Sequence, residues 1–244
     1  MISVCMATYN GSRHVLEQID SILVQLRLGD EIVIVDDAST DSTVALVRSL
    51  GDERIRIYEQ TVNAGHVAAF ETALERARGD VIILSDQDDV WLPGRVADAE
   101  QKLRNDTGIV ASNFTHMGGV GGEPSPLRST TRGGAQLSDL MGLFLGRRAY
   151  FGSTMAITTR FRDQLLPFPR GTEAHDHWMA ILGIIGRSMR HSDQVAVLRR
   201  IHGSNLTPTT RRGWTKVLMT RVTMGRLTLI AATRVARTAL EARR

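Results

Sequence analysis

The sequence predicts an α/β protein with a mostly parallel sheet flanked by helices. In its first half, short apolar runs alternate with segments whose apolar residues recur at helical spacing, and turn or capping residues separate them. A repeated strand–helix order is typical of parallel strands joined by right-handed crossovers, with helices on both faces of the sheet. At 244 residues the chain can bury its own core, and a single large domain is the simplest organisation.

Five apolar runs in the first half predict strands, at residues 2–8, 31–37, 54–60, 80–86 and 108–114. The segments between them predict helices, at residues 10–25, 39–50, 64–77 and 93–104. Pro93 suits the first position of the last of these helices, because a proline there gives up no helical hydrogen bond.

The second half is less regular. Residues 115–135 are rich in Gly, Ser, Thr and Pro and predict a loop over one rim of the sheet, either a lid or a tolerated insertion. Beyond this loop we expect a strand at 147–158, a helix at 175–186, a last strand at 194–205 and a helix from Trp214 onward.

Charge is distributed unevenly. Residues 1–205 carry 21 basic and 25 acidic side chains, whereas 206–244 carry nine basic side chains and Glu241 alone. No apolar run approaches the ~20 residues needed to cross a bilayer. Cys5 is the single cysteine and the N-terminus has no basic leader, so we expect a cytoplasmic protein without disulfides.

The stretch "VIILSDQDDVW" runs from a core strand directly into three carboxylates, Asp86, Asp88 and Asp89. One such residue is commonly a helix cap or a turn former. Three close together repel one another unless a cation or hydrogen-bond donors compensate. Mg²⁺ and Mn²⁺ are typically held by one or two carboxylates together with substrate phosphates. Because ligands of parallel sheets bind beyond the carboxyl ends of the strands, the pattern predicts a metal and phosphate site there.

Other mononucleotide folds fit less well. A phosphoacceptor receiver domain would place its acidic pair after the first strand, but Asp36 and Asp37 follow the second strand. It would also place a lysine after a later strand, but neither of the two lysines, Lys102 and Lys216, follows an apolar strand. The glycine patterns of dinucleotide-binding folds and of P-loop proteins are also absent from the sequence.

The stretches "ATYNG", "IVIVDDASTD", "NAGHVAAFETAL", "SDQDDVWLPGR" and "HDHW" together resemble the family 2 glycosyltransferases. The resemblance covers roughly residues 1–205, and bacterial rhamnosyltransferase-like members look closest through "LSDQDDVW", "FGSTMAI" and "RRIHGSN". It implies a GT-A fold with a nucleotide-binding half at 1–114 and an acceptor half at 115–205. The basic helical extension at 206–244 lies outside it.

The resemblance implies metal-dependent, inverting transfer of a sugar from a uridine or thymidine diphosphate donor to a hydroxyl of a glycan or lipid-linked glycan in cell-surface polysaccharide synthesis. Tyr9 would lie against the base, with Asp37 accepting hydrogen bonds from the base and Asp36 close by. Asp86 would reach the ribose or the metal, and Asp88 would bind Mn²⁺ or Mg²⁺ directly.

Two further roles on the metal side have alternatives. His202 would complete the metal shell or else be a loop histidine that donates to backbone. Asp89 is expected to support the site or to cap a helix.

On the acceptor side, the resemblance makes Asp176 the general base. The same residue could cap the helix that follows, and one residue can do both. Trp178 would stack on a sugar or else belong to the core. Ser153 and Thr154 would offer hydroxyls beside Gly152, or "FGSTMAI" is simply a buried strand.

A non-catalytic nucleotide-sugar-binding protein of the same fold is the main alternative, although it would be expected to have lost Asp88 or Asp176. A nucleotidyltransferase would show a basic, glycine-rich signature after the first strand, which is absent from the sequence.

The helix at 212–244 is basic and amphipathic. It would lie on an anionic membrane, or pack on its own domain or in a homodimer. Nucleic acid is not an expected partner, since the body of the chain is acidic.

Overall fold

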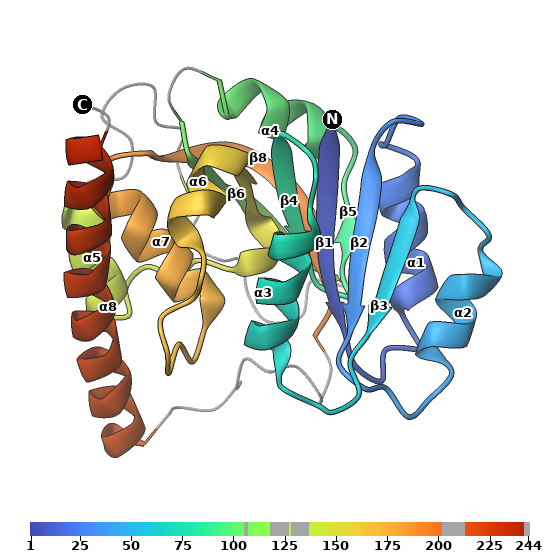
Figure 1. Cartoon of the computed structure of the whole chain (residues 1–244), viewed down its shortest axis with the longest axis horizontal. Helices are drawn as coiled ribbons and strands as arrows, with labels where there is room; N and C mark the ends of the chain where they lie inside the picture. Colours follow the sequence, from blue (N-terminus) through green and yellow to red (C-terminus); the bar gives the residue numbers. More distant parts are fainter. Residues whose placement is uncertain (105–106, 118–126, 128–136, 202–212, 242–244) are drawn as a thin grey trace.

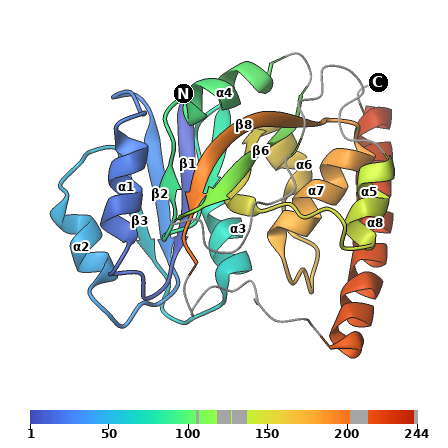
Figure 2. The same ribbon diagram turned by 180° about the vertical axis from the view of Figure 1, so that it is seen from behind.

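The computed structural model describes residues 1–104, 107–117, 127, 137–201 and 213–241 (Figures 1 and 2). Within these residues the chain forms one eight-stranded sheet with the strand order β3-β2-β1-β4-β7-β6-β8-β5. The strands are β1 (Ile2–Thr8), β2 (Glu31–Asp36), β3 (Ile55–Glu59), β4 (Val81–Ser85), β5 (Val90–Trp91), β6 (Ile109–His116), β7 (Met155–Thr158) and β8 (Met189–Arg199).

The helices are α1 (Val15–Leu23), α2 (Thr43–Ser49), α3 (His66–Arg76), α4 (Arg95–Lys102), α5 (Leu137–Phe144), α6 (Thr159–Leu165), α7 (His175–Ile185) and α8 (Trp214–Glu241), with a 3-10 turn η2 (Gly152–Thr154) before β7. The predicted α/β class with a mostly parallel sheet is confirmed. β1 pairs in parallel with both β2 and β4, and β2 pairs in parallel with β3.

The sheet buries both of its faces, which explains why its first strands are continuous apolar runs. Side chains alternate across a strand, so Cys5 joins the core on one face while Val4 and Met6 join the core on the other. The Cys5 face is covered by α3 and by α5 to α8, and the opposite face by α1 and α4 (Figures 1 and 2).

The second half differs from the expectation in three respects. The strand predicted at 147–158 is confined to Met155–Thr158, because Gly152–Thr154 form a turn, and this strand runs antiparallel between β4 and β6. β8 begins at Met189, five residues earlier than predicted. Helices α5 and α6 were not predicted. In the first half, the two-residue strand β5 was not predicted either.

The boundaries of the first-half elements also shift slightly. α1 begins at Val15, not at residue 10, and α4 begins at Arg95 after Gly94, whose φ of 86° is a left-handed conformation that suits glycine. Pro93 therefore precedes the helix by two residues and is not its first residue.

Candidate active site

The carboxyl ends of β1, β2 and β4 lie side by side at one end of the sheet (Figure 1). Strand pairing runs to the last residues, with Thr8 opposite Asp36 and Met6 opposite Ser85. The polar residues that follow these strands therefore share one rim, as parallel topology requires.

Asp86, Asp88 and Asp89 form the acidic cluster of this rim. Each offers a carboxylate oxygen, and these oxygens lie within 4.8 Å of one another. Asp86 and Asp88 are half-buried, and Asp89 is 3% exposed. One oxygen of Asp89 accepts a hydrogen bond from the Arg200 backbone N–H at 3.1 Å, while its buried Oδ2 has no hydrogen-bond partner among the described residues.

Burial and the negative charges of neighbouring carboxylates raise the pKa values of Asp86 and Asp89. Desolvation is the main cause for both Asp86 and Asp89. The Asp89 and Asp88 charges then raise the pKa of Asp86, and the Asp88 charge raises the pKa of Asp89. Without a cation, Asp86 and Asp89 therefore hold protons to a higher pH than ordinary carboxyl groups do.

The positive charge of Arg199 limits this effect. The Arg199 guanidinium lies over the rings of Phe114 (5.1 Å) and Phe151 (4.3 Å), and its charge lowers the pKa of both Asp86 and Asp89. The Arg199 Nε–H is buried without a hydrogen-bond partner in the described part of the chain. Arg199 was not predicted as a site residue, although it stands at the end of β8 beside the "RRIHGSN" stretch.

Arg95 supports the cluster from inside the protein. Its guanidinium is buried, lies 4.1 Å from the ring centre of Trp91, and donates to the Leu84 carbonyl oxygen at 2.8 Å and to the Ser153 carbonyl oxygen. Burial lowers the pKa of Arg95 to about 9, although the negative charges of Asp89 and Asp86 act to raise it. Arg95 thereby ties β4 to the turn η2.

The cluster fits a divalent cation. It supplies three closely spaced carboxylates, and the buried Oδ2 of Asp89 has no hydrogen-bond partner among the described residues. Hard cations such as Mg²⁺ and Mn²⁺ prefer such oxygen ligands and would offset the repulsion that raises the pKa values.

This electrostatic strain predicts an unusual pH dependence for the metal-free protein. A carboxyl group with a raised folded-state pKa binds more protons folded than unfolded, so the free energy of unfolding falls as pH rises from about 4, the unfolded pKa, toward neutrality. Asp86→Asn should therefore raise metal-free stability at pH 8 by on the order of 1 kcal/mol and leave it nearly unchanged at pH 4. Thermal unfolding at both pH values measures this, with the exposed Asp193→Asn as matched control. Equal effects of the two substitutions at pH 8 would refute it.

Tyr9 is tied to the acidic loop through Gln87. The Tyr9 backbone N–H donates to Gln87 Oε1 at 2.9 Å, and Gln87 Nε2 donates to the Tyr9 carbonyl oxygen at 3.0 Å. Gly11 leaves room for this side chain, since a Cβ there would lie 2.2 Å from Gln87 Oε1. The Tyr9 side chain is 45% exposed and remains available to a ligand.

Asp36 and Asp37 are both buried and both hold the backbone of the rim. Asp36 accepts from the Thr8 hydroxyl at 2.8 Å and from the N–H and hydroxyl of Ser39 at 2.8 and 2.6 Å. Asp37 accepts from the backbone N–H groups of residues 64 and 65, just before α3, at 2.7 and 2.8 Å. The structure brings both residues to the predicted rim, and each also shapes it.

The turn η2 lies between the acidic cluster and the N-terminus of α7. The buried Ser153 hydroxyl is near enough to Asp86 and Asp89 to lower their pKa. Gly152 packs against His175, since a Cβ there would lie 2.2 Å from His175 Nε2. The Thr154 hydroxyl donates to the Phe151 carbonyl oxygen within its own turn at 2.9 Å, so it is less available than predicted.

Asp176 stands in the first turn of α7, half-buried, and its Oδ1 accepts from the His177 backbone N–H at 2.7 Å. The N-cap position is Ala174, so Asp176 is not the cap of the helix. Its negative charge stabilises the helix through the partial positive charge of the first turn.

His66, at the start of α3, was not predicted as a site residue. Burial lowers the His66 pKa, whereas the Asp176 and Asp37 charges raise it, so this imidazole lies within electrostatic reach of both carboxylates.

The neighbouring His175 is buried, and neither ring nitrogen has a hydrogen-bond partner among the described residues. Its ring centre lies 4.2 Å from that of Phe70 and 5.7 Å from that of His66. Burial lowers the His175 pKa to about 4, so this side chain is neutral at pH 7.

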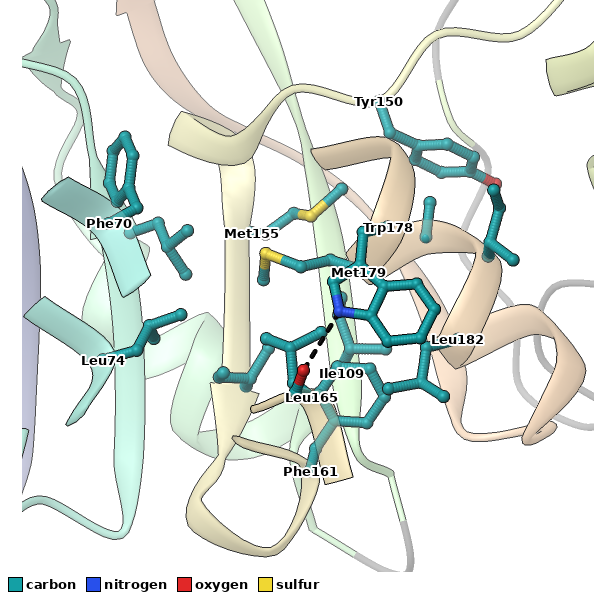
Figure 3. Close-up of a cluster of buried hydrophobic side chains, with 14 of the residues drawn as sticks. Phe70, Leu74, Ile109, Tyr150, Met155, Phe161, Leu165, Trp178, Met179 and Leu182 are labelled. Carbon is teal, nitrogen blue, oxygen red and sulfur yellow. Dashed lines mark hydrogen bonds between the residues drawn. The ribbon is translucent and has the colours of Figure 1, made fainter. Parts of the chain in front are cut away.

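Trp178 does not lie where an acceptor could stack on it. Its side chain is 0% exposed, its indole N–H donates to the Leu165 carbonyl oxygen at 3.1 Å, and the ring packs among core residues (Figure 3). The position fits the core alternative, because residues 178–182 of α7 are all buried. His202 and nearly all of the 115–135 loop lie outside the described residues.

Comparisons with known proteins agree with this geometry. The sequence profile described as glycosyl transferase family 2 matches residues 3–165. An uncharacterized glycosyltransferase of Nostoc sp. is 30% identical over 84% of this chain and 66% of its own length. The UDP-Glc:alpha-D-GlcNAc-diphosphoundecaprenol beta-1,3-glucosyltransferase WfgD of Escherichia coli is 29% identical over 47% of this chain and 46% of its own length. The chain thus spans about half to two thirds of these relatives.

Solved structures support the GT-A fold. S. aureus TarS 1-349 in complex with UDP-GlcNAc superimposes with a TM-score of 0.73 at 17% identity, covering 91% of this chain and 66% of that one. The mannosyltransferase PcManGT from Pyrobaculum calidifontis, in complex with GDP-Man and Mn²⁺, gives a TM-score of 0.64 at 19% identity over 98% and 75% of the two chains. The predicted GT-A fold is confirmed, and none of these relatives bears on the rhamnosyltransferase-like subtype. With a profile match across two thirds of its length, the chain belongs to glycosyl transferase family 2.

Proposed function

We propose that this chain transfers a sugar, with inversion, from a uridine or thymidine diphosphate donor to a hydroxyl of a glycan or lipid-linked glycan acceptor. The observation that carries the proposal is the acidic cluster of Asp86, Asp88 and Asp89 at the carboxyl end of β4, in a chain of this family. The product would enter a cell-surface polysaccharide. The cytoplasm is the proposed compartment, in keeping with the free, buried thiol of Cys5.

On the donor side, Tyr9 would lie against the base, with Asp37 accepting hydrogen bonds from it and Asp36 holding the loop. Asp88 would be the direct ligand of Mn²⁺ or Mg²⁺, with Asp86 reaching the metal or the ribose and His202 completing the shell. A bound divalent cation would stabilise the negative charge that develops on the leaving diphosphate. We add Arg199 to this set, because its positive charge acts on Asp86 and Asp89 and would also attract the diphosphate.

On the acceptor side, Asp176 would remove the proton from the acceptor hydroxyl as that oxygen attacks the anomeric carbon. Its position supports this role, because the start of α7 and the acidic cluster adjoin the same turn, η2. Ser153 would stay near the reacting groups, whereas Trp178 is excluded from contact with the acceptor by its burial.

A thermal-shift panel of nucleotide sugars, with and without Mn²⁺, tests the donor proposal. Stabilisation grows with the logarithm of ligand concentration over the dissociation constant, so a true donor should stabilise more than its nucleoside diphosphate alone. TarS was solved with UDP-GlcNAc and PcManGT with GDP-Man, so the panel should include guanosine as well as uridine and thymidine donors. A thermal shift that is the same with and without Mn²⁺, or the absence of any shift, would count against the proposal.

A non-catalytic nucleotide-sugar-binding protein of the same fold remains the alternative. It would give the same thermal shifts, but sugar would not leave the donor. Release of nucleoside diphosphate in the presence of acceptor therefore separates the two.

A further inference from the structure

Helix α8 carries two apolar faces, and only one of them is used by the described structure. One face packs on the domain through Met224, Leu227 and Ala231, which are buried against the Cys5 side of the core. Packing on its own domain was one of the alternatives that the sequence left open for this helix, and the structure shows this packing.

The second face is an exposed apolar stripe. It contains Trp214, Leu218, Val222, Leu229 and Leu240, which are 64–90% exposed. At 100° per residue these positions fall within one narrow sector, about 140° around the helix axis from the buried face. The gaps in the sector are filled by Gly225, Ala232 and Ala236. The stripe therefore runs the length of a 28-residue helix without a charged residue.

Basic side chains flank this stripe. Arg226 and Arg237 lie along one border and Arg221 along the other, by the same angular count. The single acidic residue of α8 is Glu241, and it already pairs with Arg237 at 2.8 Å. Arg234 does not border the stripe, since it donates to the carbonyl oxygens at the end of α6 and lies over the Trp178 ring.

Helix α5 adds a second exposed apolar row next to α8. Leu137, Met141 and Leu145 follow one another at four-residue spacing and are 52–69% exposed. The end of α5 adjoins α8, since a Cβ on Gly146 would lie 3.3 Å from the Arg221 guanidinium, and α5 lies along α8 in both views (Figures 1 and 2). The one acid of α5, Asp139, is buried and paired with Arg148.

We propose that this α8 stripe, with its basic borders and the neighbouring row of α5, docks on a membrane surface rich in anionic phospholipid. An apolar stripe bordered by cations suits the boundary between acyl chains and anionic headgroups. Within the described parts of the chain, no helix has both the length and the apolar character of a membrane span. The contact that we propose is a peripheral one, along the surface of α8.

Charge favours this occupant over a second copy of the chain. Two copies joined through the stripe would bring Arg221, Arg226 and their counterparts together, and no unpaired acid on α8 would offset them. Anionic headgroups supply the missing negative charge. α8 also begins at the end of the molecule to which the carboxyl ends of β1, β2 and β4 point (Figure 1).

The three tryptophans provide a direct readout, because Trp214 is 90% exposed whereas Trp91 and Trp178 are 3% and 0% exposed. Adding vesicles of mixed phosphatidylcholine and phosphatidylglycerol should shift the tryptophan emission to shorter wavelength. Pure phosphatidylcholine should do so far less, and added salt should weaken the effect. Trp214→Phe should bind in vesicle flotation but lose the emission shift.

A matched pair of variants tests the stripe itself. Leu218→Gln should weaken partitioning into the mixed vesicles about tenfold or more, since it removes one buried leucine from the interface. Met219→Gln alters the adjacent residue, 67% exposed against 66% for Leu218, but outside the stripe, and should change partitioning less than threefold. Both side chains are exposed, so thermal unfolding should be unchanged in either variant.

The proposal would be overturned by absence of binding to the mixed vesicles, by equal effects of the two substitutions, or by equal binding to neutral vesicles. A Leu218-dependent dimer that ignores vesicles would assign the stripe to a second copy instead. No nucleotide sugar enters these experiments, so their outcome is independent of the proposed transferase activity.

Discussion

Asp176→Asn is expected to reduce sugar transfer by about 10²- to 10⁴-fold, the usual contribution of a positioned general base. Asparagine has nearly the shape of aspartate but cannot take up the acceptor proton. The donor dissociation constant should remain within about twofold of that of the unsubstituted protein, because Asp176 belongs to α7 and the proposed donor ligands follow β1, β2 and β4.

The measurement is the initial rate of nucleoside diphosphate release at saturating donor, together with the donor dissociation constant in Mn²⁺. His177→Gln is a suitable control, because it changes the next residue of the same helical turn and keeps Asp176. A fall in donor affinity that matches the fall in rate would show that Asp176 acts on binding and not on the proton.

Asp88→Asn is expected to remove the Mn²⁺-dependent part of donor binding and to reduce transfer about 100-fold or more. This follows because a metal ion stabilises the leaving diphosphate by several kcal/mol, and 1.36 kcal/mol corresponds to a factor of ten in rate. The substitution also removes a charge that raises the pKa of Asp86 and Asp89. The metal-free variant should therefore be at least as stable as the original at neutral pH.

Isothermal titration of nucleoside diphosphate, with and without Mn²⁺, measures the first effect, and thermal unfolding measures the second. The exposed Asp193→Asn serves as the control for loss of one negative charge. If Asp88→Asn bound Mn²⁺ and donor as the original does, the metal would have to be held elsewhere. Loss of both binding and fold in the metal-free variant would contradict the electrostatic account.

The first half of the fold could be predicted because its strands are buried on both faces and read as unbroken apolar runs. The sequential order of strands and helices then fixes parallel pairing for β1, β2 and β4. Strand β7 could not be placed in the same way, because its neighbours β4 and β6 are far from it in sequence and its pairing depends on tertiary contacts. The prediction of a longer strand failed at Gly152, where the chain turns against His175.

The acidic cluster was predictable because its three carboxylates are adjacent in sequence and the strand before them is apolar. Its supporting residues were not, because they come from other parts of the chain. Arg199 acts on the cluster from the end of β8. The role of Gln87 becomes visible only through its hydrogen bond with the Tyr9 backbone. The amphipathic pattern of the tail predicted a helix, but the separate buried and exposed faces appear only when α7 is in place beside it.

We propose that the crowded carboxylates near Asp88 coexist at neutral pH by sharing a divalent cation with a diphosphate. A crystal of the protein soaked with Mn²⁺ and uridine diphosphate tests this directly through the anomalous signal of manganese. We expect one manganese peak within about 2.0–2.3 Å of an Asp88 carboxylate oxygen, with diphosphate oxygens completing its shell. A nucleotide bound at the rim with no manganese among these carboxylates would contradict it.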